Sequence, residues 1–525
     1  MRLATLFVFS TLFSALAQTP NADDLVWQKA TQKFDAKRAS ILKHVDSTAQ
    51  AGPFKPTWDS LKTYKVPEWY QDAKFGIFIH WGAYSVPAFG SEWYPREMYK
   101  QGTKEFKHHA ATFGAQSKFG YKDFIPQFKA EKFDPKAWAD LFRKSGAKYV
   151  MPVGEHHDGF PMYNSELTDW CAAKMGPKRD VVGELAGAVR AAGMHFGVSS
   201  HRAEHYFFLN QGRQFDSDVR DPRNAAFYGP AHVGVDPVSA MHWNGHPDKA
   251  YLNDWLARTA EMVDRYHPEI VWFDWWIETK EFEPYLQKFA SYYYNDAAKR
   301  GSTAAINNKF DAFPQGTAVL DIERGQLDKA ESRFWQTDTS VSIKSWGYVD
   351  NDTFRSPESL IHQLIDIVSK NGCLLLNIGP KSDGTIPDAE QKILLDMGRW
   401  LAVNGEAIYG TRPWSIYGEG PTKVVGGSFN DTATKAYKAE DIRFTAKGNA
   451  LYAITLGWPE TGKLTIKALA QGAAQKLGTI SKVELVGSNA TIKWTRDAKG
   501  LQLAVPGPRS GNYAWVFRIT HTAAK

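Results

Sequence analysis

Cysteine is scarce in this 525-residue sequence, which contains only Cys171 and Cys373. Two thiols are too few for a disulfide framework or for a four-thiolate zinc site. They leave two alternatives open, namely one disulfide bond in an oxidising compartment or two buried free thiols. A disulfide-rich scaffold is therefore excluded.

An excess of charge of one sign is also absent. The chain has 63 Lys and Arg residues against 57 Asp and Glu residues, a formal net charge of +6, and no block of basic residues. Nucleic-acid binding usually needs basic residues gathered into a patch or stripe. Hydrophobic residues make up 43% and charged residues 23%, an ordinary globular balance. We therefore expect no nucleic-acid partner, no long disorder and no polytopic membrane protein.

One apolar stretch stands at the N-terminus. Arg2 precedes the apolar residues 3–16, and the small-x-small pattern Ala15-Leu16-Ala17 ends them. This arrangement is typical of a cleavable secretory signal peptide, and the stretch is short for a membrane span. The sequence predicts a signal peptide over residues 1–17, a secreted or periplasmic protein and no membrane span. An uncleaved anchor is the alternative.

Aromatic residues, in contrast, are abundant, with 19 Trp, 22 Tyr and 31 Phe. A large aromatic share suits big cores and sites that stack on sugar rings or on bases. Short apolar runs alternate with capped helical patterns over residues 58–417, which favours an α/β fold with an irregular (β/α)8-like (TIM) barrel. A doubly wound open sheet is the alternative, but no Gly-x-Gly-x-x-Gly turn follows any strand. The predicted strands are 75–79, 149–153, 196–198, 270–273, 319–322 and 373–376.

Two further segments flank the predicted barrel domain. Residues 18–57 are expected to form a helical lead-in. Beyond Gly418, short alternating segments separated by Gly and Asn turns predict a C-terminal all-β sandwich over residues 418–525.

In a barrel of this kind, catalytic groups lie at the C-terminal ends of the strands. Asp274 follows one predicted strand and is flanked in sequence by aromatic residues. Desolvation of its carboxylate there would cost free energy, so we expect either a catalytic role or a charged partner. Glu323 follows another strand. Two carboxylates about 5 Å apart across a sugar form a retaining glycosidase pair. Ion pairing of Asp274 with an arginine, or of Glu323 with its neighbours Asp321 and Arg324, is the structural alternative.

Several histidines also follow strands, and they permit three interpretations. His80, His156, His157, His201 and His205 have the donor chemistry of zinc ligands, of sugar-hydroxyl partners or of ordinary structural residues. Adjacent histidines on a strand point to opposite faces, so His156 and His157 cannot both be simple ligands unless the strand breaks.

The motifs taken together resemble the α-L-fucosidases of glycoside hydrolase family 29. The resemblance covers residues 57–420 and rests on many segments in a fixed order. They are FGIFIHWG (75–82), SEWY (91–94), EHHDGF (155–160), GPKRD (176–180), VWFD (271–274), WQTD (335–338), SWGY (345–348), SKNG (369–372), LLLNIGP (374–380) and NGEAIYG (404–410).

This resemblance implies a barrel followed by a β-sandwich, a retaining mechanism and no cofactor or metal. Asp274 matches the family's nucleophile, and Glu323 resembles its acid/base, with Glu278, Glu283 and Glu204 as substitutes. A terminal fucose of an oligosaccharide or glycoconjugate is the implied substrate. The positions expected to bind it are His80, Glu92, Trp93, His156, His157, His201, Trp272 and Trp346, the last of them beside the methyl group.

Two departures from the family pattern bear on these roles. Many members have Tyr after the third strand, where this chain has Ser199-Ser200-His201-Arg202, so His201 is expected to replace a tyrosine contact with fucose. Many members have Lys before the paired histidines, where this chain has Glu155. The sequence thus predicts an exo-α-L-fucosidase. Its rivals are an α-L-galactosidase, a fucose-binding protein without catalysis, and a barrel metallohydrolase.

Overall fold

The computed structural model describes residues 21–239, 242–474, 477–505, 507, 509 and 511–522. The predicted signal peptide, residues 1–17, lies outside the described residues. Among the described helices, none is both long enough and apolar enough to cross a bilayer.

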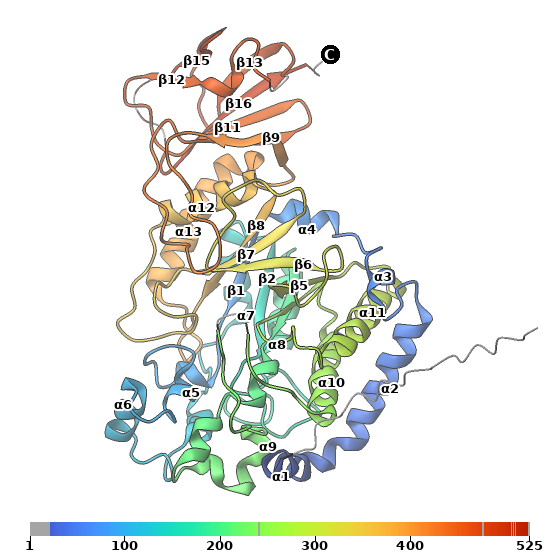
Figure 1. The fold of residues 1–525 in the computed structure, drawn as a ribbon. Helices are drawn as coiled ribbons and strands as arrows, with labels where there is room; N and C mark the ends of the chain where they lie inside the picture. The colour runs from blue at the N-terminus through green and yellow to red at the C-terminus, as the bar shows by residue number, and fades with distance from the viewer. Residues whose placement is uncertain are drawn as a thin grey trace, which may run out of the picture.

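Eight parallel strands close into a barrel in the order β1-β2-β3-β4-β5-β6-β7-β8, which confirms the predicted fold class (Figure 1). Most crossovers bring a helix to the outside of the barrel, whereas β5, β6 and β7 follow one another without a helix between them. The strands covered in this way are buried on both faces and are mostly rich in apolar residues. Their bounds are β1 Phe75–Ile79, β2 Tyr149–Glu155, β3 His195–Ser200, β4 Ile270–Phe273, β5 Ala305–Lys309, β6 Val319–Glu323, β7 Trp335–Ser340 and β8 Gly372–Ile378.

The helices of the barrel domain follow the capping signals in the sequence. Asp134 accepts hydrogen bonds from the first turn of α7, and Ser356 caps α12 in the same way. The helices from α4 onward are α4 Glu68–Ala73, α5 Tyr94–Glu97, α6 Lys104–Thr112, α7 Pro135–Lys144, α8 Val181–Ala191, α9 Ala225–Tyr228, α10 Lys249–Tyr266, α11 Glu283–Lys299, α12 Pro357–Ser369 and α13 Asp388–Asn404.

The N-terminal segment is helical, with α1 Ala22–Thr31, α2 Asp35–Ala51 and α3 Trp58–Leu61. Helix α2 packs along the barrel helices α10 and α11 (Figure 1). Arg38 of α2 reaches the buried carboxylate of Asp254 in α10, at 2.8 Å. The segment is therefore joined to the barrel wall by a partly buried ion pair.

The C-terminal residues form two antiparallel sheets that share one hydrophobic core. The five-stranded sheet has the order β13-β16-β11-β10-β9, and the three-stranded sheet has the order β12-β15-β14. Strand β9 straddles residue 418, where the sequence predicts the domain boundary. The strands are β9 Arg412–Glu419, β10 Ile442–Lys447, β11 Ala450–Thr455, β12 Lys463–Ile466, β13 Ile480–Leu485, β14 Lys493–Asp497, β15 Gly500–Ala504 and β16 Trp515–His521.

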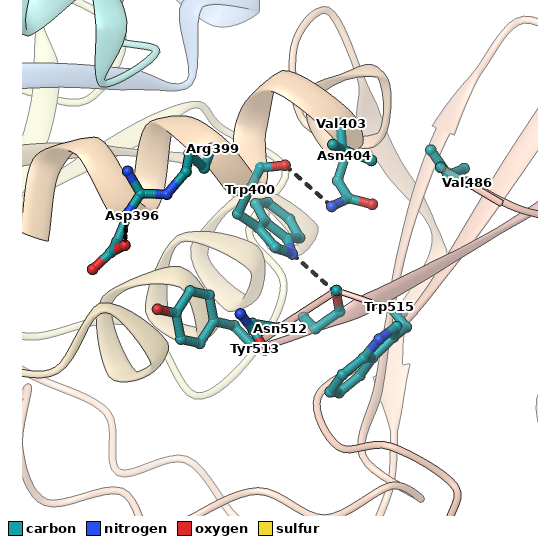
Figure 2. A pocket seen from close by; sticks show the side chains of 12 residues that line it. Asp396, Arg399, Trp400, Val403, Asn404, Val486, Asn512, Tyr513 and Trp515 are labelled. Carbon is teal, nitrogen blue, oxygen red and sulfur yellow. Dashed lines mark hydrogen bonds and ion pairs between the residues drawn. The ribbon is translucent and has the colours of Figure 1, made fainter. Parts of the chain in front are cut away.

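Helices α12 and α13 lie between the barrel and these sheets (Figure 1). Arg443 of β10 donates through Nε to Asp366 of α12 at 2.6 Å, and Lys370 Nζ contacts the other oxygen of Asp366 at 2.6 Å. Helix α13 and residues of the C-terminal sheets also line a pocket, whose volume is about 320 Å³. Figure 2 shows its lining residues, among them Trp400 of α13, which donates its indole N–H to the Ala514 carbonyl. The pocket is part of the contact between the two domains.

Both cysteines are buried free thiols. Of the two alternatives that the sequence leaves open, the structure therefore has the unpaired one. Burial raises the pKa of the Cys373 thiol to about 12, so this thiol is not reactive at neutral pH.

Candidate active site

Asp274 directly follows β4, and its carboxylate faces two histidines. Its Oδ2 lies 2.8 Å from His201 Nδ1 and 3.5 Å from His157 Nε2. Burial alone would raise the pKa of this carboxyl, but the contacts with His201, then His157, and the charge of Lys309 outweigh it and lower the pKa. Asp274 is therefore ionised at neutral pH. Its partners are imidazoles rather than the arginine of the structural alternative.

The ionised state of Asp274 fixes the tautomer of His201. Because a carboxylate only accepts hydrogen bonds, Nδ1 of His201 carries the proton, and Nε2 accepts from the hydroxyl of Ser199 at 2.9 Å. Both ring nitrogens of His201 thus have protein partners. In this structure His201 orients Asp274, and a direct contact with a sugar hydroxyl requires one of these bonds to open.

The paired histidines both belong to the site because the strand ends before them. Strand β2 stops at Glu155, so His156 and His157 lie in the following turn with ring centroids 4.1 Å apart. The ring of His156 lies 5.5 Å from that of His80 and 4.7 Å from that of His201. Burial lowers the pKa of all four histidines, so they are neutral.

Asn377 in β8 holds one wall of the site. Its Oδ1 accepts from His80 Nδ1 at 2.7 Å, and its amide nitrogen donates to the carbonyl of Trp346 at 2.7 Å. Glu92 accepts from the backbone N–H of Trp346 at 2.8 Å. These bonds place the Trp346 ring 5.1 Å from that of His80, in a stacked orientation.

The remaining predicted sugar-binding residues complete the same cluster. Trp272 lies at the end of β4 with its ring 5.1 Å from that of His201, and Trp93 packs edge-on against His157 at 5.6 Å. The buried atoms His156 Nδ1 and Trp272 Nε1 have no protein hydrogen-bond partner. Buried polar atoms are normally paired, so these two are available to a polar ligand.

Glu323 is the last residue of β6 and accepts a hydrogen bond from Trp275 Nε1. Its Oε2 lies 3.7 Å from Lys309 Nζ at the end of β5. Burial raises the pKa of Glu323, the cation of Lys309 opposes this, and the negative charge of Asp274 raises it further. The two candidate carboxylates therefore have opposite pKa shifts, which is the pattern of a nucleophile and an acid.

The neighbours of Glu323 do not form the plain ion pair with it that the sequence leaves open. Asp321 binds Lys309 Nζ at 2.7 Å, and Asp338 of β7 binds the same nitrogen at 2.6 Å. Arg324 donates to the carbonyls of Ser342 and Ser345, and its guanidinium stacks on the Trp346 ring at 4.6 Å.

The other candidate acids differ in position. Glu204 is buried, with Oε2 2.9 Å from His157 Nδ1, and burial raises its pKa. Burial raises the pKa of Glu278 to about 7, so Glu278 is the alternative acid/base against which Glu323 has to be tested. Glu283 begins α11 and accepts from Trp58 of the N-terminal segment at 2.8 Å, so it faces away from the histidines.

Glu155, where many family members have Lys, faces arginines rather than the histidine cluster. It binds Arg202 and lies 3.4 Å from Arg258 of α10, and Arg202 also binds Asp254. The negative charge that Glu155 introduces at this position is thus balanced by the buried guanidinium groups of Arg202 and Arg258.

Among the described residues, two sets of three side chains have ligand atoms close enough together to hold one metal ion. They are His80, His156 and His201, and His157, His201 and Asp274, with ligand atoms within 4.8 Å of one another. His201 is common to both sets, and both of its nitrogens already have protein partners. A metal at either set requires His201 to give up one of them.

Sequence reasoning assigned no role to Lys309, Ser199 or Asn377, although all three contact residues of the candidate site. Asn377 stands within the quoted segment 374–380, and Ser199 lies two residues before its partner His201, so the sequence holds a signal for both. Lys309 contacts Glu323 across the pairing of β5 with β6, which sequence spacing does not show.

The comparisons with known proteins agree with this geometry. The family description Alpha-L-fucosidase matches residues 41–406, and that of the Alpha-L-fucosidase C-terminal domain matches residues 430–520. An α-L-fucosidase of Branchiostoma floridae is 32% identical over 480 residues, covering 89% of this chain and 95% of that protein. The human tissue α-L-fucosidase is 31% identical over 502 residues, covering 91% and 95%.

A solved structure of a Thermotoga maritima α-fucosidase in complex with fucose has the same fold. Its TM-score is 0.69 at 32% identity, and the match covers 89% of this chain and all of that one. The family match spans both domains, and the carboxylates and histidines lie where the strands of the barrel end. The chain therefore belongs to the α-L-fucosidase family of glycoside hydrolases.

Proposed function

We propose that this protein removes terminal α-L-fucose from fucosylated glycans with retention of configuration, with Asp274 as nucleophile and Glu323 as acid/base. The observation that carries the proposal is the placement of these two largely buried carboxylates at the ends of β4 and β6, Asp274 against two histidines and Glu323 beside Lys309 and Trp275, and their opposite pKa shifts agree with it. Both histidine contacts of Asp274 fall on Oδ2, so attack through Oδ1 keeps both of them.

In the first step, Asp274 Oδ1 forms a bond to the anomeric carbon while the bond from this carbon to the leaving oxygen breaks. Glu323 gives its proton to that oxygen. In the second step, ionised Glu323 takes a proton from water, the water oxygen bonds to the anomeric carbon, and the bond to Asp274 breaks. Fucose leaves, and both carboxyl groups return to their starting states.

The charge coupling between the two carboxylates supports the change of role. In the free enzyme burial raises the pKa of Glu323, Lys309 opposes this, and the charge of Asp274 raises the pKa further, which favours the protonated acid. Once Asp274 is esterified, this charge is gone, so the pKa of Glu323 falls and the residue is ready to act as a base.

For sugar recognition we propose the cluster of predicted residues, with His156 Nδ1 and Trp272 Nε1 as hydrogen-bond partners of substrate hydroxyls. Trp346 offers an apolar wall for the methyl group. A hydrophobic wall discriminates by only about 100-fold against an added hydroxyl. Slow turnover of α-L-galactosides is therefore expected beside that of fucosides.

The testing experiment compares an aryl α-L-fucoside with wild type, Asp274→Gly, Glu323→Ala and Glu278→Ala, each with and without azide. We expect azide to give a β-fucosyl azide with Asp274→Gly and an α-fucosyl azide with Glu323→Ala. A wild type that binds fucose without turnover supports the binding-protein alternative. An α-fucosyl azide from Glu278→Ala instead of Glu323→Ala assigns the acid/base to Glu278. Loss of wild-type activity with a chelator supports the metallohydrolase.

We also propose that the protein is exported, to the outside of the cell or to a periplasm. The support is the apolar segment 3–16 followed by Ala15-Leu16-Ala17. N-terminal sequencing of the protein from its source is expected to begin at Gln18. A mature chain that begins at Met1 or Arg2 contradicts cleavage.

A further inference from the structure

The segment between β9 and β10, residues 420–441, leaves the C-terminal sheets and reaches the rim of the barrel; we name it the β9–β10 arm. Its backbone pairs with the residues around the acid/base. Phe429 N donates to the carbonyl of Glu323 at 2.9 Å, and Asp431 N donates to that of Arg324 at 2.9 Å. Gly427 N donates to the carbonyl of Gln326 at 2.8 Å.

The β9–β10 arm is held closely against the barrel. A side chain on Gly325 would place its Cβ 2.0 Å from the carbonyl oxygen of Gly427, so glycine permits the approach. Asp431 of the arm binds Thr339 of β7 and lies 3.2 Å from the guanidinium of Arg355. The backbone of the arm at residues 427–431 therefore has a defined position next to Glu323.

Phe429 is the side chain of the arm that points to a function. Among the described residues, Phe310 and Phe429 are the only aromatic side chains in the exposed class, with 43% and 52% of their surfaces accessible. An exposed phenyl ring leaves apolar surface in contact with water, which is unfavourable. A ligand that covers the ring removes this unfavourable contact. Every other aromatic side chain of the described residues is buried or half-buried, so this exposure marks a contact surface.

The ring of Phe429 is aligned with Trp275. Their centroids are 6.5 Å apart with an interplanar angle of 19°. Trp275 donates its indole N–H to Glu323, the proposed acid/base. Two nearly parallel aromatic rings therefore lie immediately beyond the carboxyl group that protonates the leaving oxygen.

We propose that Phe429 and Trp275 form the binding site for the leaving group of the substrate, and that this group is a pyranose ring. This inference rests on the proposed function. The leaving oxygen must lie at Glu323, so the next sugar ring lies beside Trp275 and Phe429. The C–H face of a pyranose is flat and apolar, and it packs on an aromatic ring as other apolar groups do. The C-terminal domain thus contributes a residue to substrate recognition.

The test uses two substrates that share fucose and differ in the leaving group. One is α-L-fucosyl fluoride, which has no leaving ring, and the other is the fucosyl disaccharide that wild type hydrolyses fastest. The readout is the ratio of kcat/KM for the disaccharide to kcat/KM for the fluoride. We expect Phe429→Ala to lower this ratio about threefold to tenfold, the effect of losing one aromatic contact. Phe429→Tyr, which retains the ring, is expected to restore it.

Val425→Ala is the matched control, because Val425 is an exposed apolar residue of the same arm with 41% of its surface accessible. It is expected to leave the ratio at the wild-type value. An unchanged ratio in Phe429→Ala, or a Phe429→Tyr as impaired as Phe429→Ala, overturns the leaving-group site. A wild type that hydrolyses neither substrate overturns the proposed function instead, so the two failures are distinguishable.

Discussion

At the scale of single residues, Lys309 has the most direct influence on the proposed acid/base. Its ammonium group is buried between Asp321 and Asp338 and lies 3.7 Å from Glu323. Burial opposes this charge, but the surrounding carboxylates outweigh it and raise the pKa of Lys309. Lys309 therefore stays protonated and moderates the pKa of Glu323.

Lys309→Met is expected to shift the basic limb of the pH profile of kcat/KM to higher pH. Burial and the charge of Asp274 raise the pKa of Glu323, and Lys309 lowers it, so removal of the cation raises it further. Glu323 then keeps its proton to higher pH. The basic limb reports the acid of the free enzyme, so pH-dependent kinetics measure the shift.

Lys309→Arg retains the charge and is the control for this profile. It is expected to keep the basic limb near its wild-type position. Lys309→Met is also expected to lower the melting temperature, because Asp321 and Asp338 lose their buried cation. A basic limb that moves to lower pH in Lys309→Met contradicts the assigned electrostatics.

Most residues that the structure brings together in the candidate site could be picked out from the sequence, because they directly follow apolar strands. Asp274 comes after β4, and the paired histidines come after β2. Glu323 is recognisable in the same way at the end of β6. The role of His201 as the orienting partner of Asp274 was not predictable, since it depends on a 2.8 Å contact between residues 73 positions apart.

At the scale of elements, the sequence predicts the barrel strands with apolar side chains and misses those with polar side chains. The bounds of β1 and β4 equal the predicted ones because both strands are continuous apolar runs. The sequence analysis did not predict β5 or β7, which carry polar residues such as Asn307 and Gln336 in the barrel. Tyr70 OH donates to the side-chain oxygens of both residues, and this pairing lowers the cost of burying them, although the amide nitrogen of Asn307 has no protein partner.

Helix α8 contains a glycine without a structural requirement. Gly187 is exposed in the helix interior, and an added Cβ would meet no atom within 4 Å. Gly187→Ala is expected to stabilise the protein by about 0.5–1 kcal/mol, because alanine loses less backbone entropy on folding. Urea denaturation measures the gain.

Gly183 in the same helix is the contrast for this variant. A Cβ there would lie 2.4 Å from Oδ2 of Asp180, the side chain that caps α8. Gly183→Ala is therefore expected to give less stabilisation than Gly187→Ala or a net loss. Equal gains at both positions contradict the role of the cap.

Gly325 permits the β9–β10 arm to approach the barrel. Gly325→Ala is expected to displace the arm, because the new methyl group overlaps the carbonyl of Gly427 at 2.0 Å. Hydrogen–deuterium exchange is expected to speed up at Phe429 and Asp431 and to stay unchanged in β1 and β8. Gly187→Ala serves as the control, and unchanged exchange in the arm contradicts the close approach.

At the scale of the whole molecule, two of the arginine ion pairs between the C-terminal sheets and the barrel domain lie in different environments. Arg443 binds Asp366 where both side chains are almost fully buried. Arg518 binds Glu406 at 3.0 Å where both side chains remain 36% accessible. Removal of one partner of a buried pair costs about 3–5 kcal/mol, whereas an exposed pair contributes about 0–1 kcal/mol.

Arg443→Met is therefore expected to separate the unfolding of the two domains. Calorimetry of wild type is expected to show one transition, and that of Arg443→Met two, with the C-terminal sheets unfolding first. Arg518→Met is the matched control and is expected to retain one transition. A single transition in Arg443→Met means that apolar contacts such as those of Trp400 suffice to couple the domains.

The β9–β10 arm also has a consequence for how such enzymes diversify. Asp274 and Glu323 stand on strands of the closed barrel, whereas Phe429 stands on a connection between two strands of a different domain. A substitution of the Phe429 side chain keeps the backbone hydrogen bonds of the arm to Glu323 and Arg324, so it can alter which glycans are accepted without disturbing the residues that cleave the bond. Bond cleavage and substrate preference are thus encoded by residues more than 100 positions apart in the sequence, and selection can change one while conserving the other.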